Sequence, residues 1–225
     1  MTHKRHTPLP VVVLISGGGS NLQALIDAIE DGALKVEIRA VISNRGDALG
    51  LKRAERAGIP AIVLDNHAFP DRDAYEARLR ALIDRFAPGL VVLAGFMRIL
   101  EAKTVNHYLG RMVNIHPSLL PQFQGLRTHA RALEARVERH GASVHFVTPE
   151  LDGGPVIVQV AVPVHPDDDV DRLAARVLRW EHRIYPLAVT WFAEGRLILR
   201  DDVVEFDGRR LDAPLRFDPV TGEVA

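Results

Sequence analysis

The chain has 225 residues, of which 47% are hydrophobic and 25% charged, and it contains no cysteine. Without cysteine there is no disulfide, no thiolate nucleophile and no Cys-ligated zinc. A net charge of −1 offers no attraction to nucleic acid, and no apolar run approaches the roughly 18 residues that a membrane helix needs. Residues 1–10 lack the apolar stretch of a secretory signal. We therefore expect one cytoplasmic domain over 1–225 that binds small molecules, with no nucleic acid or membrane partner.

The first half of the chain alternates short apolar runs with segments of helical period. Strands are expected at 11–16, 36–43, 59–64, 90–94 and 112–115. Helices are expected at 21–30, at 47–57 with Gly58 as its C-terminal cap, from the capping Asp71 to the stop at Pro88, and at 101–108. This alternation is typical of a parallel sheet covered on both faces.

The second half follows a different pattern. Two prolines stiffen the loop 116–121, with Leu120–Pro121 as a candidate cis bond. A helix is expected at 130–139, an antiparallel strand pair at 143–148 and 156–163, a long helix at 170–192, a hairpin at 196–200 and 203–206, and a loose tail at 211–225. The fold class is therefore α/β, a three-layer α/β/α arrangement with a mostly parallel, mixed sheet of about seven strands.

A glycine loop, Gly17 to Gly19, joins the first strand to the first helix. Backbone N–H groups at such a helix start bind phosphate, although a lone glycine loop is as often a plain turn. A dinucleotide site would need a third small residue and a carboxylate after the second strand, but Leu22 and the segment 43–45 (Ser-Asn-Arg) stand there. A single phosphate, contacted by Ser20 and Asn21 with Gly19, is the better ligand.

Asn114 and His116 stand two residues apart at the end of a strand, so their side chains share one face. An amide donor and an imidazole suit a developing oxyanion, whereas buried Asn and His also often only satisfy backbone groups. Asp152, in a glycine-containing loop, would favour the charged imidazolium of His116. Together these three residues indicate chemistry at an acyl carbon.

Other polar residues occupy positions where apolar ones are expected. Glu181 falls on the apolar stripe of the long helix, so it needs a partner, either an arginine or a ligand. Ser143 and His145 alternate on one strand face and are supporting candidates. Taken alone, Met97, Ile99 and Leu100 would be core residues.

Five segments together resemble the phosphoribosylglycinamide formyltransferases of the folate-dependent formyltransferase superfamily. They are 17–27 (GGGSNLQALID), 94–100 (AGFMRIL), 114–121 (NIHPSLLP), 143–147 (SVHFV) and 151–154 (LDGG). The resemblance runs in order from about residue 11 to residue 191. It implies a Rossmann-like formyltransferase fold, 10-formyltetrahydrofolate as cosubstrate, no metal, and a monomer or weak homodimer.

The resemblance also implies a role for individual residues. Asn114, His116 and Asp152 would be catalytic, and the ribonucleotide would be bound by its phosphate at Gly19, Ser20 and Asn21 and by its ribose at Glu181. Residues 8–110 would then form a phosphate-binding half and 111–210 a catalytic and folate-binding half. The folate pocket would be lined by Arg72, Met97, Arg98, Ile99, Leu100, Asn114 and Val147.

Two positions depart from the pattern of this family. Gly18 replaces a residue that is often polar, and Gln122-Phe123-Gln124 lacks a basic residue beside the aromatic, which puts substrate affinity in doubt.

The competing functions are a methionyl-tRNA or sugar-nucleotide formyltransferase, a formyltetrahydrofolate hydrolase, a non-catalytic nucleotide-binding module and a small oxidoreductase. A methionyl-tRNA formyltransferase would need an added RNA-binding domain, and a formyltetrahydrofolate hydrolase would need an N-terminal regulatory domain. An oxidoreductase would need the ribose-binding carboxylate that is missing after the second strand.

Overall fold

The computed structural model describes residues 7–225; the first six, part of the segment expected not to be a secretory signal, lie outside the described residues. Eight strands form one sheet. In their order across the sheet they are β11 (Leu215–Phe217), β7 (Val156–Pro163), β6 (Arg139–Phe146), β5 (Met112–His116), β4 (Leu90–Leu93), β1 (Leu9–Ile15), β2 (Val36–Ser43) and β3 (Ala61–Val63).

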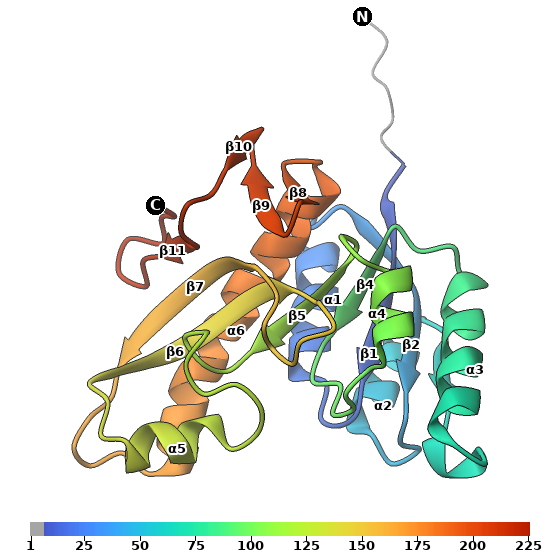
Figure 1. Ribbon diagram of the computed structural model, residues 1–225, viewed down its shortest axis with the longest axis horizontal. Helices are drawn as coiled ribbons and strands as arrows, with labels where there is room; N and C mark the ends of the chain where they lie inside the picture. Colours follow the sequence, from blue (N-terminus) through green and yellow to red (C-terminus); the bar gives the residue numbers. More distant parts are fainter. Residues whose placement is uncertain (1–6) are drawn as a thin grey trace, which may run out of the picture.

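Helices cover both faces of this sheet (Figure 1). In chain order they are α1 (Ser20–Glu30), α2 (Leu49–Arg56), the single-turn η1 (Asn66–Ala68), α3 (Arg72–Asp84), α4 (Ala102–His107), α5 (Thr128–Glu134) and α6 (Val170–Ala193). A separate small sheet contains β8 (Leu197–Arg200), β9 (Val203–Phe206) and β10 (Arg209–Arg210). The three-layer α/β/α arrangement predicted from the sequence is confirmed.

Strand β1 shows why the sheet is buried on both sides. Val11, Val13 and Ile15 pack under α1, α2 and α6, whereas Val12 and Leu14 pack under α3 and α4. Because successive side chains of a strand point to opposite faces, an unbroken apolar run fills two cores at once. All five of these residues are at most 1% exposed.

The direction of the strands gathers several loops at one edge. β3, β2, β1, β4 and β5 are parallel neighbours, and β6 then pairs antiparallel with both β5 and β7. The loops after β1, β2, β4 and β5 therefore all leave from the carboxyl edge, where open α/β sheets bind ligands. α6 passes behind β5, β6 and β7 in Figure 1 and closes the rear of this region.

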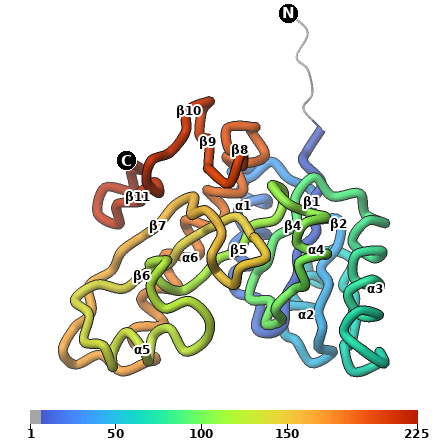
Figure 2. The backbone as a smooth tube through the Cα atoms, viewed as in Figure 1, coloured from blue at the N-terminus to red at the C-terminus, as the bar shows by residue number. Residues whose placement is uncertain are grey.

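The expected elements differ from the structure in several places. The strand expected at 143–148 is β6, which spans Arg139–Phe146 instead. The helix expected at 130–139 ends at Glu134, because Arg136 adopts a left-handed φ of 53° and Arg139 already pairs with Pro163 in the β6–β7 ladder. The tail at 211–225 is not loose, since its strand β11 pairs in parallel with β7 and is the eighth strand of the sheet (Figure 2). The hairpin at 196–206 is confirmed and gains β10 as a third strand. Leu120–Pro121 is cis, as expected.

A pair of glycines sets the distance between the loop after β1 and helix α2. A Cβ on Gly50 would lie 2.5 Å from Ile15 Cδ1 and 3.2 Å from the backbone Cα of Gly19. The Gly50 N–H also donates to the carbonyl of Gly17 at 3.0 Å. Two backbones approach here without intervening side chains, so α2 supports the glycine loop directly.

We expect Gly50→Ala to destabilise the protein by about 1–3 kcal/mol, because the added methyl group overpacks a site that is already filled. In a chain of this length the corresponding fall in Tm is roughly 3–10 °C, measurable by differential scanning calorimetry. Gly46→Ala is the matched control, since its Cβ would meet only Val63 Cγ1 at 3.9 Å. Equal Tm values for the two variants would contradict the close packing of Gly50.

Candidate active site

The register between β5 and β6 brings four polar side chains of the two strands into pairs. Asn114 lies directly opposite His145, and His116 lies opposite Ser143. All four alternate with apolar residues, so they share the same face of the sheet. The pair Asn114 and His116 was expected together from its spacing, but its alignment with Ser143 and His145 follows only from the antiparallel pairing.

His145 fixes the orientation of the Asn114 amide. Nδ1 of His145 lies 2.8 Å from the carbonyl oxygen of Phe146, so Nδ1 carries the proton and Nε2 accepts. Burial lowers the pKa of His145 to about 4, which keeps the ring neutral near pH 7. Asn114 Nδ2 therefore donates to His145 Nε2 over 3.2 Å. The second N–H of the same amide is left to donate into the adjoining cavity.

His116 has an oxygen atom close to each ring nitrogen. Nδ1 lies 3.4 Å from Asp152 Oδ2, and Nε2 lies 3.0 Å from the carbonyl oxygen of Phe123. Because both neighbours are acceptors, a proton on either ring nitrogen has an acceptor within reach. The imidazole and the carboxylate are both buried, at 7% and 10% side-chain exposure, so their interaction is little screened by solvent.

Asp152 is held in place by the loop that carries it and by the loop opposite. Its Oδ2 accepts the backbone N–H of Gly125 at 2.9 Å, and its own carbonyl accepts the Gln124 side-chain amide at 3.2 Å. The residue has a left-handed φ of 48°, and a Cβ on nearby Gly154 would lie 1.9 Å from the Phe146 carbonyl oxygen. Only glycine fits at that crossing, which confirms the close approach expected of this loop.

Ser143 lies beneath the loop that follows His116, and its polar contacts run to that loop and to β7. Its hydroxyl donates to the Ser118 carbonyl at 2.6 Å and accepts from the Leu120 N–H at 3.1 Å. Gln159 of β7 donates to the same hydroxyl and to the Leu120 carbonyl. Ser143 thus anchors the chain that leaves His116.

A cavity of about 490 Å³ opens beside this polar group. Asn114, His116, His145 and Asp152 line one side of it. The other lining residues named from the sequence are Met97, Arg98, Ile99, Leu100 and Val147. Apolar walls with a few convergent polar groups are the usual features of a small-molecule site.

The core interpretation of the 97–100 segment is wrong for two of its residues. Met97 is 68% exposed and Ile99 is 59% exposed, whereas Leu100 is buried. Arg72 does not line the cavity: it donates from Nη2 to the Ile99 carbonyl at 2.5 Å and pairs with Glu101 at 3.3 Å. Arg72 therefore supports the wall of the cavity from behind.

The glycine loop ends at a helix start. Gly19 has a left-handed φ of 69° and immediately precedes α1, which begins at Ser20. Arg53 of α2 donates from Nε to the Gly18 carbonyl at 2.8 Å and from Nη1 to Gln23. The loop is thus braced by α2, with the N–H groups of the first turn of α1 at its end.

Glu181 contacts the first turn of α1 rather than an arginine. Its Oε2 accepts from Asn21 Nδ2 at 2.7 Å, and the Asn21 Oδ1 atom is buried without a hydrogen-bond partner among residues 7–225. Burial raises the pKa of Glu181, although the Asn21 hydrogen bond opposes this. The inward carboxyl expected from the helix pattern is confirmed, but its alternative partner, an arginine, is wrong.

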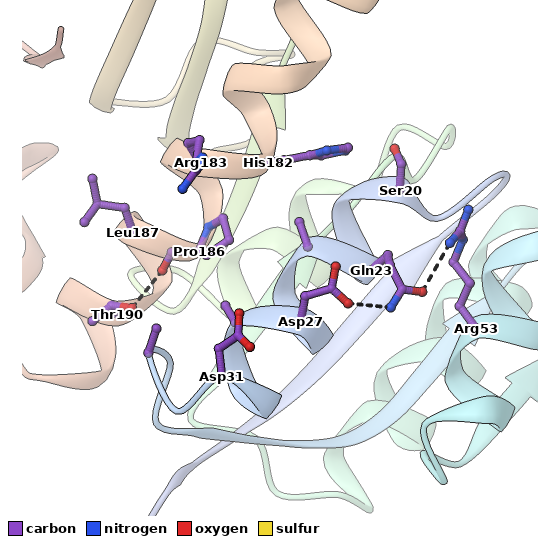
Figure 3. A pocket seen from close by; sticks show the side chains of 13 residues that line it. Ser20, Gln23, Asp27, Asp31, Arg53, His182, Arg183, Pro186, Leu187 and Thr190 are labelled. Atoms are coloured by element: carbon purple, nitrogen blue, oxygen red, sulfur yellow. Dashed lines mark hydrogen bonds between the residues drawn. The ribbon is translucent and has the colours of Figure 1, made fainter. Parts of the chain in front are cut away.

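A second hollow of about 600 Å³ lies between α1 and α6. Figure 3 shows Ser20 and Arg53 at one end of it, beside the glycine loop, and Asp31 and Thr190 at the other. Of the residues proposed for the ribonucleotide, only Ser20 lines it. Gly19, Asn21 and Glu181 line neither hollow.

Several residues of the site were not found from the sequence. Phe123 and Gly125 come from the loop between β5 and α5, which has no periodic pattern, and His129 is the second residue of α5. Gly50 and Arg53 lie on a helix whose sequence gives no sign of contact with the glycine loop. A loop stiffened by Pro117 and Pro121 directly after His116 was the one available signal.

Among residues 7–225, no three His, Cys, Asp or Glu side chains are grouped closely enough to hold a metal ion. No helix in that part of the chain is long and apolar enough to cross a membrane.

Comparison with known proteins identifies the family. Residues 9–189 match the formyl transferase family. The chain is 56% identical over 201 residues to phosphoribosylglycinamide formyltransferase of Escherichia coli. The aligned region covers 89% of this chain and 95% of that protein. The chain belongs to the phosphoribosylglycinamide formyltransferase family. The resemblance read from the five sequence segments is therefore confirmed.

Solved structures of this family share the fold described above. Phosphoribosylglycinamide formyltransferase from Coxiella burnetii superposes with a TM-score of 0.90 at 52% identity, covering 94% of this chain and all of that one. A formyltetrahydrofolate deformylase from Pseudomonas putida is also similar, with a TM-score of 0.80 at 28% identity, covering 88% of this chain and 70% of that one. A formyltransferase and a deformylase thus share this architecture, and the site residues must distinguish them.

Proposed function

We propose that this enzyme transfers the formyl group of 10-formyltetrahydrofolate to the amine of N1-(5-phospho-D-ribosyl)glycinamide. The products are the N-formyl ribonucleotide and tetrahydrofolate, and the reaction belongs to de novo purine (IMP) biosynthesis. The observation that supports this most is that Asn114, His116 and Asp152 together line the 490 Å³ cavity, with the His116 and Asp152 side chains buried at 7% and 10% exposure. We further propose that the enzyme is a cytoplasmic monomer or weak homodimer that needs no metal.

The reaction begins with attack of the substrate amine on the formyl carbon. A C–N bond forms, the carbonyl electrons move to oxygen, and a tetrahedral intermediate with an oxyanion results. The free N–H of Asn114 is directed at this oxygen, since its other N–H is held by His145. Collapse of the intermediate breaks the bond to N10 of the folate, which takes up a proton as the attacking amine loses one.

His116 supplies positive charge and a proton in this scheme. Asp152 stabilises the imidazolium and orders a water molecule for proton movement. In the structure, Nε2 of His116 donates to the Phe123 carbonyl. For direct donation to the oxyanion, the substrate oxygen must replace the Phe123 carbonyl as the acceptor of this N–H.

The two substrates occupy adjoining places. The phosphate of the ribonucleotide binds at Gly19, Ser20 and Asn21 at the start of α1, and the ribose hydroxyls donate to Glu181. The folate occupies the 490 Å³ cavity, against Met97, Arg98, Ile99, Leu100, Asn114 and Val147, with Arg72 supporting the wall. In this proposal residues 8–110 form the phosphate-binding half and 111–210 the catalytic and folate-binding half.

We expect Glu181→Gln to weaken ribonucleotide binding while it stabilises the fold. Because burial raises the pKa of Glu181, its protonated form favours folding below the ordinary value of 4.5, and this stability is lost as the pH rises through the raised pKa. The amide retains the Asn21 bond without a buried charge, so a Tm about 2 °C higher at pH 7 is expected. The KM for the ribonucleotide should rise about tenfold, since a bond to a charged acceptor is lost.

Glu194→Gln, an exposed carboxylate at the end of the same helix, is the control for both measurements. Thermal unfolding at pH 4 to 8 gives the Tm, and steady-state kinetics give the KM for the ribonucleotide. An unchanged ribonucleotide KM in Glu181→Gln would contradict the ribose contact, whatever the effect on stability.

Formyl transfer is tested directly with purified protein and both substrates. Deformylation of the folate is followed by absorbance, with and without the amine substrate. Rapid deformylation only when the ribonucleotide is present is expected for a transferase. Equal rates in its absence would instead support a hydrolase, the activity named for the Pseudomonas putida neighbour.

A further inference from the structure

Ser16 is a buried residue at the end of β1 that the proposed chemistry does not use. It is 4% exposed and directly precedes the glycine loop. Its hydroxyl accepts the backbone N–H of Met97 at 2.8 Å and donates to Asn44 Oδ1 at 2.5 Å. These partners come from the loops after β4 and β2, so one hydroxyl joins the ends of three strands.

The direction of every bond in this group is fixed. A backbone N–H only donates, so the Ser16 oxygen accepts from Met97 and the hydroxyl proton goes to Asn44. Asn44 Nδ2 then donates to Asn66 Oδ1 at 3.3 Å. Because each group has the one role that its neighbours require, the chain of bonds specifies a single arrangement of these loops.

The loop that Ser16 holds is a wall of the cavity. Phe96 and Leu100 of the loop between β4 and α4 pack against the core, but Met97 and Ile99 are largely exposed, so packing does not fix these two residues. Polar contacts also hold the loop. The Ser16 N–H donates to the Gly95 carbonyl at 3.0 Å, and the Ser16 hydroxyl accepts from Met97. The Arg72 guanidinium donates to the Ile99 carbonyl, and the Glu76 carboxylate accepts from the Glu101 N–H. Of these contacts, only the two made by Ser16 come from the strand that leads into the glycine loop.

We propose that Ser16 is a positioning residue that sets the folate-cavity wall at a fixed place relative to the glycine loop, so that the formyl donor meets the ribonucleotide amine in reacting geometry. This inference rests on the proposed function. The glycine loop itself keeps independent supports, the Gly50 N–H at Gly17 and Arg53 at Gly18. Loss of the Ser16 hydroxyl therefore frees the Met97 part of the donor wall, while the Ser16 N–H bond to Gly95 and the phosphate site stay in place.

The first test needs no substrate. Ser16→Ala removes the acceptor of the Met97 amide, so hydrogen exchange over residues 95–100 of the full chain should become at least about tenfold faster. Ser43→Ala is the matched control: Ser43 is also a buried serine at a strand end, but its hydroxyl bonds only to the backbone of Arg45, two residues away. Equal exchange at 95–100 in both variants would overturn the proposal.

The second test separates positioning from general stability. Ser16→Ala should raise the KM for the formylfolate about five- to tenfold and lower kcat, because orientation of the reactants is lost, while the KM for the ribonucleotide stays within about twofold. A uniform loss of active protein would lower kcat alone. An unchanged folate KM, or equal increases in both KM values, would overturn the positioning role.

The outcomes distinguish this inference from the function on which it rests. If wild-type protein transfers no formyl group, the proposed function fails, although the exchange experiment still reports on the Ser16 contact. If wild-type protein is active and Ser16→Ala behaves as Ser43→Ala does in both tests, only the positioning role fails. Titration with tetrahydrofolate by calorimetry gives the folate affinity of each variant without turnover.

Discussion

Asp152→Asn should lower the rate of formyl transfer at pH 7 by roughly 10²- to 10⁴-fold, the range seen when the carboxylate partner of a catalytic histidine is made neutral. The substituted amide is nearly the same size and can still accept the Gly125 N–H, so the loop should keep its place. What changes is the charge: the oxygen that accepts from Gly125 is also the one that faces His116 Nδ1 at 3.4 Å, and a neutral amide no longer compensates a positive ring there. The loss should appear in kcat, with both KM values little changed.

Asp218→Asn is a suitable control because it changes a carboxylate in the C-terminal segment, which caps a local turn by accepting from Val220. Circular dichroism and tetrahydrofolate binding establish that each variant is folded. A rate for Asp152→Asn within threefold of wild type at pH 7 would exclude the role of Asp152 as the partner of His116.

Asn114→Ala should lower kcat by about 10²- to 10³-fold, the loss that follows removal of one oxyanion donor in comparable acyl-transfer sites. Removal of the side chain also leaves His145 Nε2 without its donor, so a buried ring nitrogen loses its partner. We therefore expect a second effect, a stability lower by about 1–2 kcal/mol, which unfolding in urea measures.

His145→Gln separates these two contributions. It keeps the donor of Asn114 but removes the ring that orients it, so kcat should fall less than in Asn114→Ala, by about tenfold. If His145→Gln and Asn114→Ala were equally slow, orientation rather than donation would be the larger effect. If both were as active as wild type, Asn114 would not stabilise the oxyanion.

Local signals in the sequence predicted most of the fold correctly. Asp71 and Asp169 accept hydrogen bonds from Ala74 and Arg172 at the first turns of α3 and α6, because a cap requires only residues three positions apart. Buried strands follow from apolar runs in the same way. The exceptions are the end of α5 and the strand β11, where pairing with β7 determines the structure.

Part of the candidate site was also predictable from local spacing in the sequence. Asn114 and His116 share a face because their spacing is two, and Glu181 faces inward because of the helical period. The orientation of Asn114 by His145 was not predictable, since it depends on the register of β6 against β5. The acceptor of His116 Nε2 lies in a loop without periodicity.

The sequence by itself determined that this protein is an α/β formyltransferase family member, because five short motifs and the strand–helix alternation are local properties of the chain. Only the tertiary structure decided which hydrogen bonds those residues make. The Ser16 hydroxyl bonds to Asn44, which lies 28 residues away along the chain, and to Met97, which lies 81 residues away. Asn21 bonds to Glu181, 160 residues away. Contacts of such separation depend on strand order and register, which the sequence pattern does not encode residue by residue.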